Sequence, residues 1–157
     1  MRRQFQSALG ERKDPLGSPP APVHSQQDER ALTVVHRDAR VAPDAVIGEG
    51  TVVLAGAVVQ VGARIGVHSV INATAFVGHD VVIGDYALVS PGVVLGGAAS
   101  VGAGAFLGLG ALIRDHCAVG ADSFVGMGAI VMSNVASGTR LIPRVVGLPG
   151  RPEWKSS

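Results

Sequence analysis

Two adjacent residues, His79 and Asp80, are the best candidates for chemistry in this sequence. An imidazole can accept a proton near neutral pH, so a positioned histidine suits general-base catalysis. A carboxylate beside it can fix the tautomer of the ring. The pair therefore predicts a base with its orienting acid, and a solvated pair on the surface is the alternative that the residues alone leave open.

The remaining histidines carry weaker signals. His24 is expected to be solvated in a tail and His36 to be structural. His68 is expected at a corner above which Tyr86 stacks, where it makes a hydrogen bond at the surface, and His116 is expected to be a corner residue without a catalytic role. A catalytic zinc site built from histidines needs three of them as ligands around an open position. No His-x4-His spacing occurs, so no metal is expected. The sequence also lacks a G-x-S-x-G motif and a phosphate-binding loop.

A six-residue repeat must position these residues. Every sixth residue from Val35 to Val131 is aliphatic, seventeen in succession without an insertion. Four places after each stands a small residue, and Cys117 is one of them, which predicts a core residue rather than a nucleophile. An α-helix cannot keep one face at intervals of six, whereas a strand alternates with a period of two. Each hexad is therefore expected to be a short strand followed by a two-residue corner.

Three hexads are expected to close a triangular coil of 18 residues, with coils stacked roughly 4.8 Å apart. The seventeen hexads then make about 5.7 coils, a column roughly 27 Å tall. The predicted fold class is all-β, a single-stranded parallel β-helix. A narrow prism also explains why aromatic residues are 4% and charged residues 16% of the chain. Residues 34–136 are the predicted β-helix domain, 1–33 a disordered or linker-like tail, and 137–157 a C-terminal cap or arm.

Composition excludes several classes of function. The net charge of +1 gives no electrostatic case for binding nucleic acid or an anionic membrane. The uncharged stretch 86–113 is long enough for a membrane helix, but it is rich in glycine and belongs to the repeat. One cysteine permits no intrachain disulfide, and the N-terminus has no apolar signal segment. A cytoplasmic protein is expected.

The 18-residue period sorts the strands onto three faces. Face one is centred on residues 41, 59, 77, 95, 113 and 131; face two on 47, 65, 83, 101 and 119; face three on 53, 71, 89, 107 and 125. Faces one and three carry mainly apolar residues outward as well as inward. Monomers rarely expose patches of that size, so a closed homotrimer is expected, with a sticky monomer or a membrane-associated column as the alternative.

Two corners of the column contain candidate positions for binding a ligand. His79 is expected one coil below Gly97, roughly 5 Å away, where the missing side chain leaves room beside the imidazole. Leu109 and Met127 stack at the corner between faces three and one, each followed by a glycine. That apolar corner suits the pantetheine arm of an acyl carrier, or packing against another subunit.

The flanks of the His-Asp pair carry a family resemblance. The segment 71–92, which includes Val77-Gly78-His79-Asp80 and Ser90-Pro91-Gly92, resembles the sialic-acid O-acetyltransferase (NeuD) family, which includes bacterial nucleotide-sugar N-acetyltransferases. The lead-in at 35–39 and the ending at 146–151 also look like that family, so the resemblance covers 32–152.

The resemblance implies a left-handed β-helix that transfers an acetyl group from acetyl-CoA to the amine or hydroxyl of a sugar. His79 would be the general base, and Asp80 its supporting acid. Gly97, Leu109 and Met127 match positions near acetyl-CoA, in a groove between two subunits of a homotrimer. Arg140, Arg144 and Arg151 are candidates for the CoA phosphates, with plain solvated charges as the alternative.

The chain departs from the family pattern in two places. Some members have a second histidine nine positions after the base, where this chain has Leu88. Members also carry an N-terminal α/β domain that binds the nucleotide sugar, whereas about 34 residues without a glycine-rich start precede the column here. The acceptor site is therefore expected to be missing, supplied elsewhere, or formed by the column alone. An inactive trimeric scaffold and an acyltransferase of the lipid A type are the rival functions.

Overall fold

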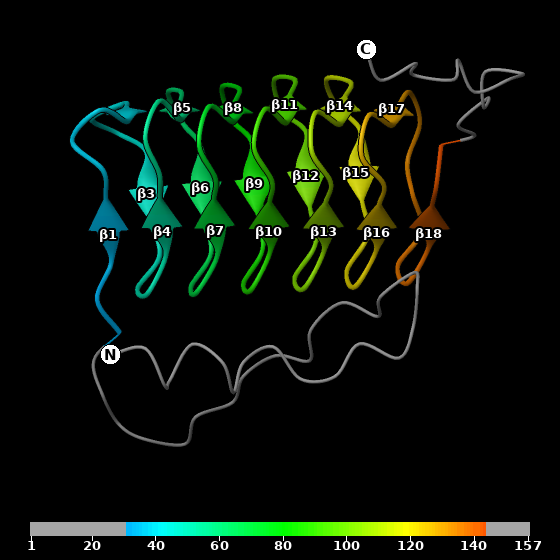
Figure 1. Ribbon diagram of the computed structural model, residues 1–157, viewed down its shortest axis with the longest axis horizontal. Coiled ribbons are helices and arrows are strands. Elements are labelled where there is room, and N and C mark those ends of the chain that lie inside the picture. The colour runs from blue at the N-terminus through cyan, green and yellow to red at the C-terminus, as the bar shows by residue number, and fades with distance from the viewer. Residues whose placement is uncertain (1–30, 144–157) are drawn as a thin grey trace, which may run out of the picture.

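The structure is a computed structural model that describes residues 31–143. It contains eighteen strands of two residues each, joined by short corners (Figure 1). The predicted tail therefore lies almost wholly outside the described residues, as does most of the predicted C-terminal arm. No helix occurs between residues 31 and 143, and hence none that could cross a membrane.

The strands form three parallel sheets, one for each predicted face. Successive strands of a sheet pair residues 18 apart, as Val77 pairs with Leu95, until the last coil. The fold is thus a left-handed parallel β-helix of about six coils, which confirms the predicted fold class.

Face one contains β2 (Arg40–Val41), β5 (Val58–Val59), β8 (Phe76–Val77), β11 (Val94–Leu95), β14 (Leu112–Ile113) and β17 (Ile130–Val131). Face two contains β3 (Val46–Ile47), β6 (Arg64–Ile65), β9 (Val82–Ile83), β12 (Ser100–Val101) and β15 (Ala118–Val119). Face three contains β1 (Val34–Val35), β4 (Val52–Val53), β7 (Val70–Ile71), β10 (Leu88–Val89), β13 (Phe106–Leu107), β16 (Phe124–Val125) and β18 (Arg140–Leu141).

The core is a single column of aliphatic and small side chains. The second residue of every strand from β4 to β17 points inward and is buried, together with the small residue that precedes the next strand. Cys117 is one of these small residues and is buried, as predicted. Three inward hydroxyls donate hydrogen bonds to backbone carbonyls across the corners: Thr51 to Gly66 (2.7 Å), Ser69 to Gly84 (2.9 Å) and Ser123 to Ala136 (3.0 Å).

The corners turn through residues with left-handed backbone. Asp80 has a φ of 56°, and the equivalent residue one coil earlier, Gly62, has a φ of 71°. Glycine adopts this conformation freely, while aspartate and asparagine adopt it more readily than most other residues. The corner after β8 therefore orients Asp80 through its backbone as well as through its side-chain contacts.

The column extends past residue 136, where the sequence predicted its end. Val135 forms a parallel bridge with Val119, and β18 pairs with β16. Both pairings are offset by 16 residues instead of 18, because the corner after β17 is two residues shorter than the others. Asn134 closes this corner by accepting a hydrogen bond from the amide of Ala118 (2.9 Å). The repeat changes phase there but does not stop, and the predicted boundary was too early.

Candidate active site

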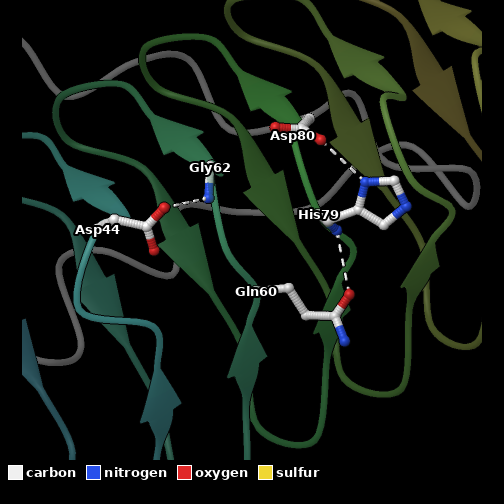
Figure 2. A network of polar contacts seen from close by, with 5 residues as sticks. All are labelled: Asp44, Gln60, Gly62, His79 and Asp80. Carbon is white, nitrogen blue, oxygen red and sulfur yellow. Dashed lines mark hydrogen bonds and ion pairs between the residues drawn. The ribbon is translucent and has the colours of Figure 1, made fainter.

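His79 and Asp80 form the corner between faces one and two, directly after β8. The Nδ1 atom of His79 lies 2.9 Å from the Oδ2 atom of Asp80 (Figure 2). Both side chains are more than half exposed, at 58% and 68%. A carboxylate can only accept a hydrogen bond, so this contact places the proton of a neutral imidazole on Nδ1. The Nε2 atom is then left with a lone pair and can accept a proton.

Gly97 lies directly above this ring in the next coil, as the 18-residue period predicts. A Cβ atom added to Gly97 would overlap the Nε2 and Cε1 atoms of His79. Glycine at this position leaves free the space that the His79 ring occupies, and no left-handed φ is involved. The basic nitrogen of His79 thus lies against bare backbone, where a substrate can approach both groups together.

The backbone beside the ring is held in place on both sides of Gly97. The amide of Ala98 donates to the carbonyl of His79 (2.8 Å), and the amide of His116 donates to the carbonyl of Gly97 (3.0 Å). Within residues 31–143, no acceptor pairs with the amide N–H of Gly97 itself. An unpaired N–H close to a base can stabilise negative charge that develops on a carbonyl oxygen.

Two residues of the preceding coils support this corner, and the hexad pattern predicted a role for neither. The Oε1 atom of Gln60 accepts a hydrogen bond from the amide of His79 (3.1 Å), and the Oδ2 atom of Asp44 accepts one from the amide of Gly62 (3.0 Å; Figure 2). A Cβ atom on Gly62 would overlap the Oδ1 atom of Asp80. The 18-residue period places these residues on adjacent coils, but it does not determine the direction in which a side chain points.

A groove of about 710 Å³ opens beside His79 on the outer side of face one, at the N-terminal end of the column. Its walls come from β2 and β5 and from the residues that flank them, and most are apolar. The lining residues are Ala39, Arg40, Val41, Ala42, Val58, Val59, Gln60, Val61 and His79.

Leu109 and Met127, the other two residues predicted near acetyl-CoA, lie at a different corner. They stack between faces three and one, with 55% and 68% of their surfaces exposed. The glycines after them, Gly110 and Gly128, have open space where a Cβ atom would be. One chain therefore brings His79, Asp80 and Gly97 together but keeps Leu109 and Met127 away from them.

The remaining candidates have other contacts. His68 stacks on Tyr86, with ring centroids 5.2 Å apart, at the corner where the 18-residue period predicts that these two residues stack. The surface hydrogen bond of His68 stays a prediction. The guanidinium of Arg140 lies over the ring of Phe124, 4.7 Å from its centroid. The Nδ1 atom of His36 accepts a hydrogen bond from the amide of Asp38. Between residues 31 and 143, no three His, Cys, Asp or Glu side chains cluster in the manner of a metal site. His24, Arg144 and Arg151 lie outside the described residues.

Comparison with known proteins finds relatives among solved structures. No model of a known protein family matches the chain. No curated protein sequence is significantly similar to it. The acetyltransferase domain of PglB from Neisseria gonorrhoeae shares 34% identity over 71% of this chain, with a TM-score of 0.70, and one of its structures is a complex with acetyl coenzyme A. A mutant of perosamine N-acetyltransferase from Caulobacter crescentus, in complex with CoA and GDP-perosamine, shares 33% identity over 71% of this chain, also with a TM-score of 0.70.

Other relatives are more distant, and none is matched along its full length. WeeI from Acinetobacter baumannii is 30% identical over 69% of this chain, with a TM-score of 0.59. The N-acyltransferase AntD from Bacillus cereus is 14% identical and shares the fold alone. The chain spans about half of the PglB domain (54%), of the perosamine enzyme (53%) and of WeeI (50%).

Proposed function

We propose that this protein is an acetyl-CoA-dependent acetyltransferase that acts on the amine of a sugar, with His79 as the general base. The observation that carries the proposal is the position of the His79 ring. Its Nδ1 atom contacts Asp80, while its Nε2 atom lies against the backbone of Gly97. This arrangement can accept a proton and stabilise an oxyanion at one place, which are the two requirements of acyl transfer.

The reaction follows from these groups. The amine of the acceptor attacks the carbonyl carbon of the acetyl thioester, so a C–N bond forms and the C–S bond breaks. His79 takes the proton from the amine at Nε2, and the resulting imidazolium gives a proton to the departing sulfur. Asp80 stabilises that imidazolium through its contact with Nδ1. The amide N–H of Gly97 stabilises the charge on the carbonyl oxygen in the transition state.

The solved structures favour an amine of a nucleotide-linked sugar over the hydroxyl of a sialic acid. Perosamine N-acetyltransferase was observed with CoA and GDP-perosamine, and the PglB domain with acetyl coenzyme A. Both share about a third of their aligned residues with this chain. Acetyl-CoA is an intracellular metabolite, so we place the reaction in the cytoplasm.

The separation of the two corners favours a site built from two copies of the chain. Leu109 and Met127 are exposed and flanked by open space, which suits a long, thin acyl carrier. They cannot meet His79 within one column, but a neighbouring column can present them to it. A homotrimer in which faces one and three contact neighbours would create three such sites.

Calorimetric titration with acetyl-CoA, followed by measurement of CoA release in the presence of an amino sugar, tests the proposal. We expect His79→Ala to bind acetyl-CoA like the wild type but to lose at least a hundredfold in kcat, the usual contribution of a general base. His116→Ala is the matched control, because His116 is also an exposed corner histidine. Equal transfer by wild type and His79→Ala would remove His79 from the mechanism.

The rival functions predict other results in the same experiment. Absence of acetyl-CoA binding by the wild-type protein would favour an inactive scaffold. Transfer from long-chain acyl donors but not from acetyl-CoA would favour an acyltransferase of the lipid A type.

A further inference from the structure

The groove beside His79 has an uneven distribution of charge. Six of its nine lining residues are alanine or valine, and none is an acid. Its charged side chain is Arg40, on β2 at the N-terminal end of the column. A mostly apolar groove with few polar groups is typical of a site for a small molecule. A lone cation in such a groove selects for a ligand with negative charge.

Arg40 has no partner among the described residues. Arg37 lies 3.8 Å from Asp38, and Arg140 covers the ring of Phe124. Between residues 31 and 143, no carboxylate lies within 4.0 Å of the Arg40 guanidinium and no aromatic ring lies under it. The guanidinium is therefore free to bind an anion, and its planar fork fits a phosphate or a carboxylate with two hydrogen bonds.

The spacing between Arg40 and His79 suits an acceptor sugar. Arg40 pairs with Val58 in β5, which pairs with Phe76 in β8. Two strand steps of about 4.8 Å separate β2 from β8, so the cation and the base are about 10 Å apart along the column axis. Both side chains line the same groove. A sugar ring lying between them would present an amine to His79 and a charged substituent to Arg40.

We infer that this groove binds the acceptor, and that Arg40 recognises an anionic group, a phosphate or a carboxylate, attached to the acceptor sugar. The inference rests on the proposed function for the position of the amine at His79. It goes further because it makes the column itself an acceptor site, and it names the charge that the acceptor must carry.

Binding titrations with four amino sugars test this inference on the full chain, in the presence of CoA. Methyl glucosaminide has no anionic group, glucosamine 1-phosphate and UDP-glucosamine carry phosphate, and glucosaminuronic acid carries a carboxylate. We expect wild type to bind at least one anionic probe roughly tenfold more tightly than methyl glucosaminide, as one charge-assisted hydrogen bond allows. The anionic probe with the largest gain in affinity over methyl glucosaminide shows whether Arg40 recognises a phosphate or a carboxylate.

Three variants assign the gain to Arg40. Arg40→Gln should abolish the preference for anionic probes without changing the affinity for methyl glucosaminide, and Arg40→Lys should keep most of it. Arg64→Gln is the matched control, because Arg64 occupies the same place in its strand β6 but lies on face two, outside the groove. Equal losses in Arg40→Gln and Arg64→Gln, or no preference in the wild type, would overturn the inference.

Measurements of sedimentation, acetyl-CoA binding and acetyl transfer separate this inference from the proposed function and from a role of Arg40 in subunit contact. If Arg40→Gln dissociated the trimer, Arg40 would serve the contact between copies of the chain and not the acceptor, and the inference would be wrong. If acetyl-CoA failed to bind while the anionic preference persisted, the proposed function would fail and the anion site would stand. If transfer to a neutral amino sugar depended on His79 but no probe distinguished Arg40→Gln from the wild type, the proposed function would stand and the anion site would fail.

Discussion

At the scale of single residues, the candidate site depends on where two nitrogen atoms of one ring lie. His79 contacts Asp80 through Nδ1 and the backbone of Gly97 through Nε2. Each contact needs a particular neighbour, an acid in the same corner and a glycine one coil later. The sequence predicted both neighbours, because Asp80 directly follows His79 and the 18-residue period places Gly97 one coil later.

Gln60 shows what the period could not predict. Its backbone position follows from the repeat, but its contact depends on a side chain leaning along the column toward the next coil. The Oε1 atom of Gln60 accepts the hydrogen bond of the His79 amide, and Gln60 also lines the groove. It contacts the backbone of the base and not the ring, so we regard Gln60 as a positioning residue.

Replacing Gln60 should change turnover more than stability. We expect Gln60→Leu to lower kcat about three- to tenfold, equivalent to one neutral hydrogen bond of about 1 kcal/mol, with no change in the KM for acetyl-CoA. Gln60→Glu keeps an acceptor oxygen at the same reach and should retain most of the activity at saturating acceptor. Steady-state kinetics and urea unfolding of both variants would check this. A loss of stability in Gln60→Leu that matches the loss of kcat would indicate a purely structural role.

At the scale of strands and corners, the sequence predicted most of the fold because one rule repeats. Every strand from β2 to β17 ends on a predicted aliphatic position, and Leu95 and Leu107 are fully buried in the column. The rule failed at the corner after β17, where the omission of two residues shifts the phase. Val135 and Leu141 continue the hexad spacing after that shift, so the signal was present but lay out of register with the rest.

Two neighbouring residues of β11 test the alternation of inward and outward side chains. Leu95 is fully buried, whereas Val94 points outward and is 39% exposed. Leu95→Ala should cost about 3 to 5 kcal/mol of the free energy of unfolding, because it leaves a cavity in a column that has no adjacent layer to fill it. Val94→Ala is the matched control, and it should cost clearly less than Leu95→Ala because it opens no cavity inside the column. Urea denaturation of the two variants measures the difference, and similar costs would contradict the assigned directions.

At the scale of the whole molecule, the described column leaves apolar side chains on its outside. Leu112 and Ile130 are outward neighbours in β14 and β17 of face one, with 42% and 63% of their surfaces exposed. On face three, Phe106 stacks on Phe124 with ring centroids 4.9 Å apart. A closed trimer would cover both faces and would bring Leu109 and Met127 of one copy toward His79 of another. Assembly and catalysis are therefore linked in our proposal.

A charge placed on face one should separate the subunits. We expect the wild-type protein to sediment as a trimer at micromolar concentration, and Ile130→Glu to sediment as a monomer. Burial of such a side chain is worth about 1.5 to 3 kcal/mol, and symmetry repeats the loss three times. Val82→Glu is the matched control, since Val82 is an outward residue of face two with 49% of its surface exposed. A monomeric wild type, or equal dissociation of the two variants, would contradict the proposed trimer.

The same variants decide whether the site needs a second copy. Ile130 does not line the groove beside His79, so its replacement leaves the base and its acid in place within each chain. If the acetyl-CoA site is shared between subunits, monomeric Ile130→Glu should lose affinity for acetyl-CoA while Val82→Glu keeps it. The affinity of Ile130→Glu should also rise with protein concentration, because association restores the missing wall. A monomer that binds acetyl-CoA as tightly as the wild type would show that one column contains the whole site.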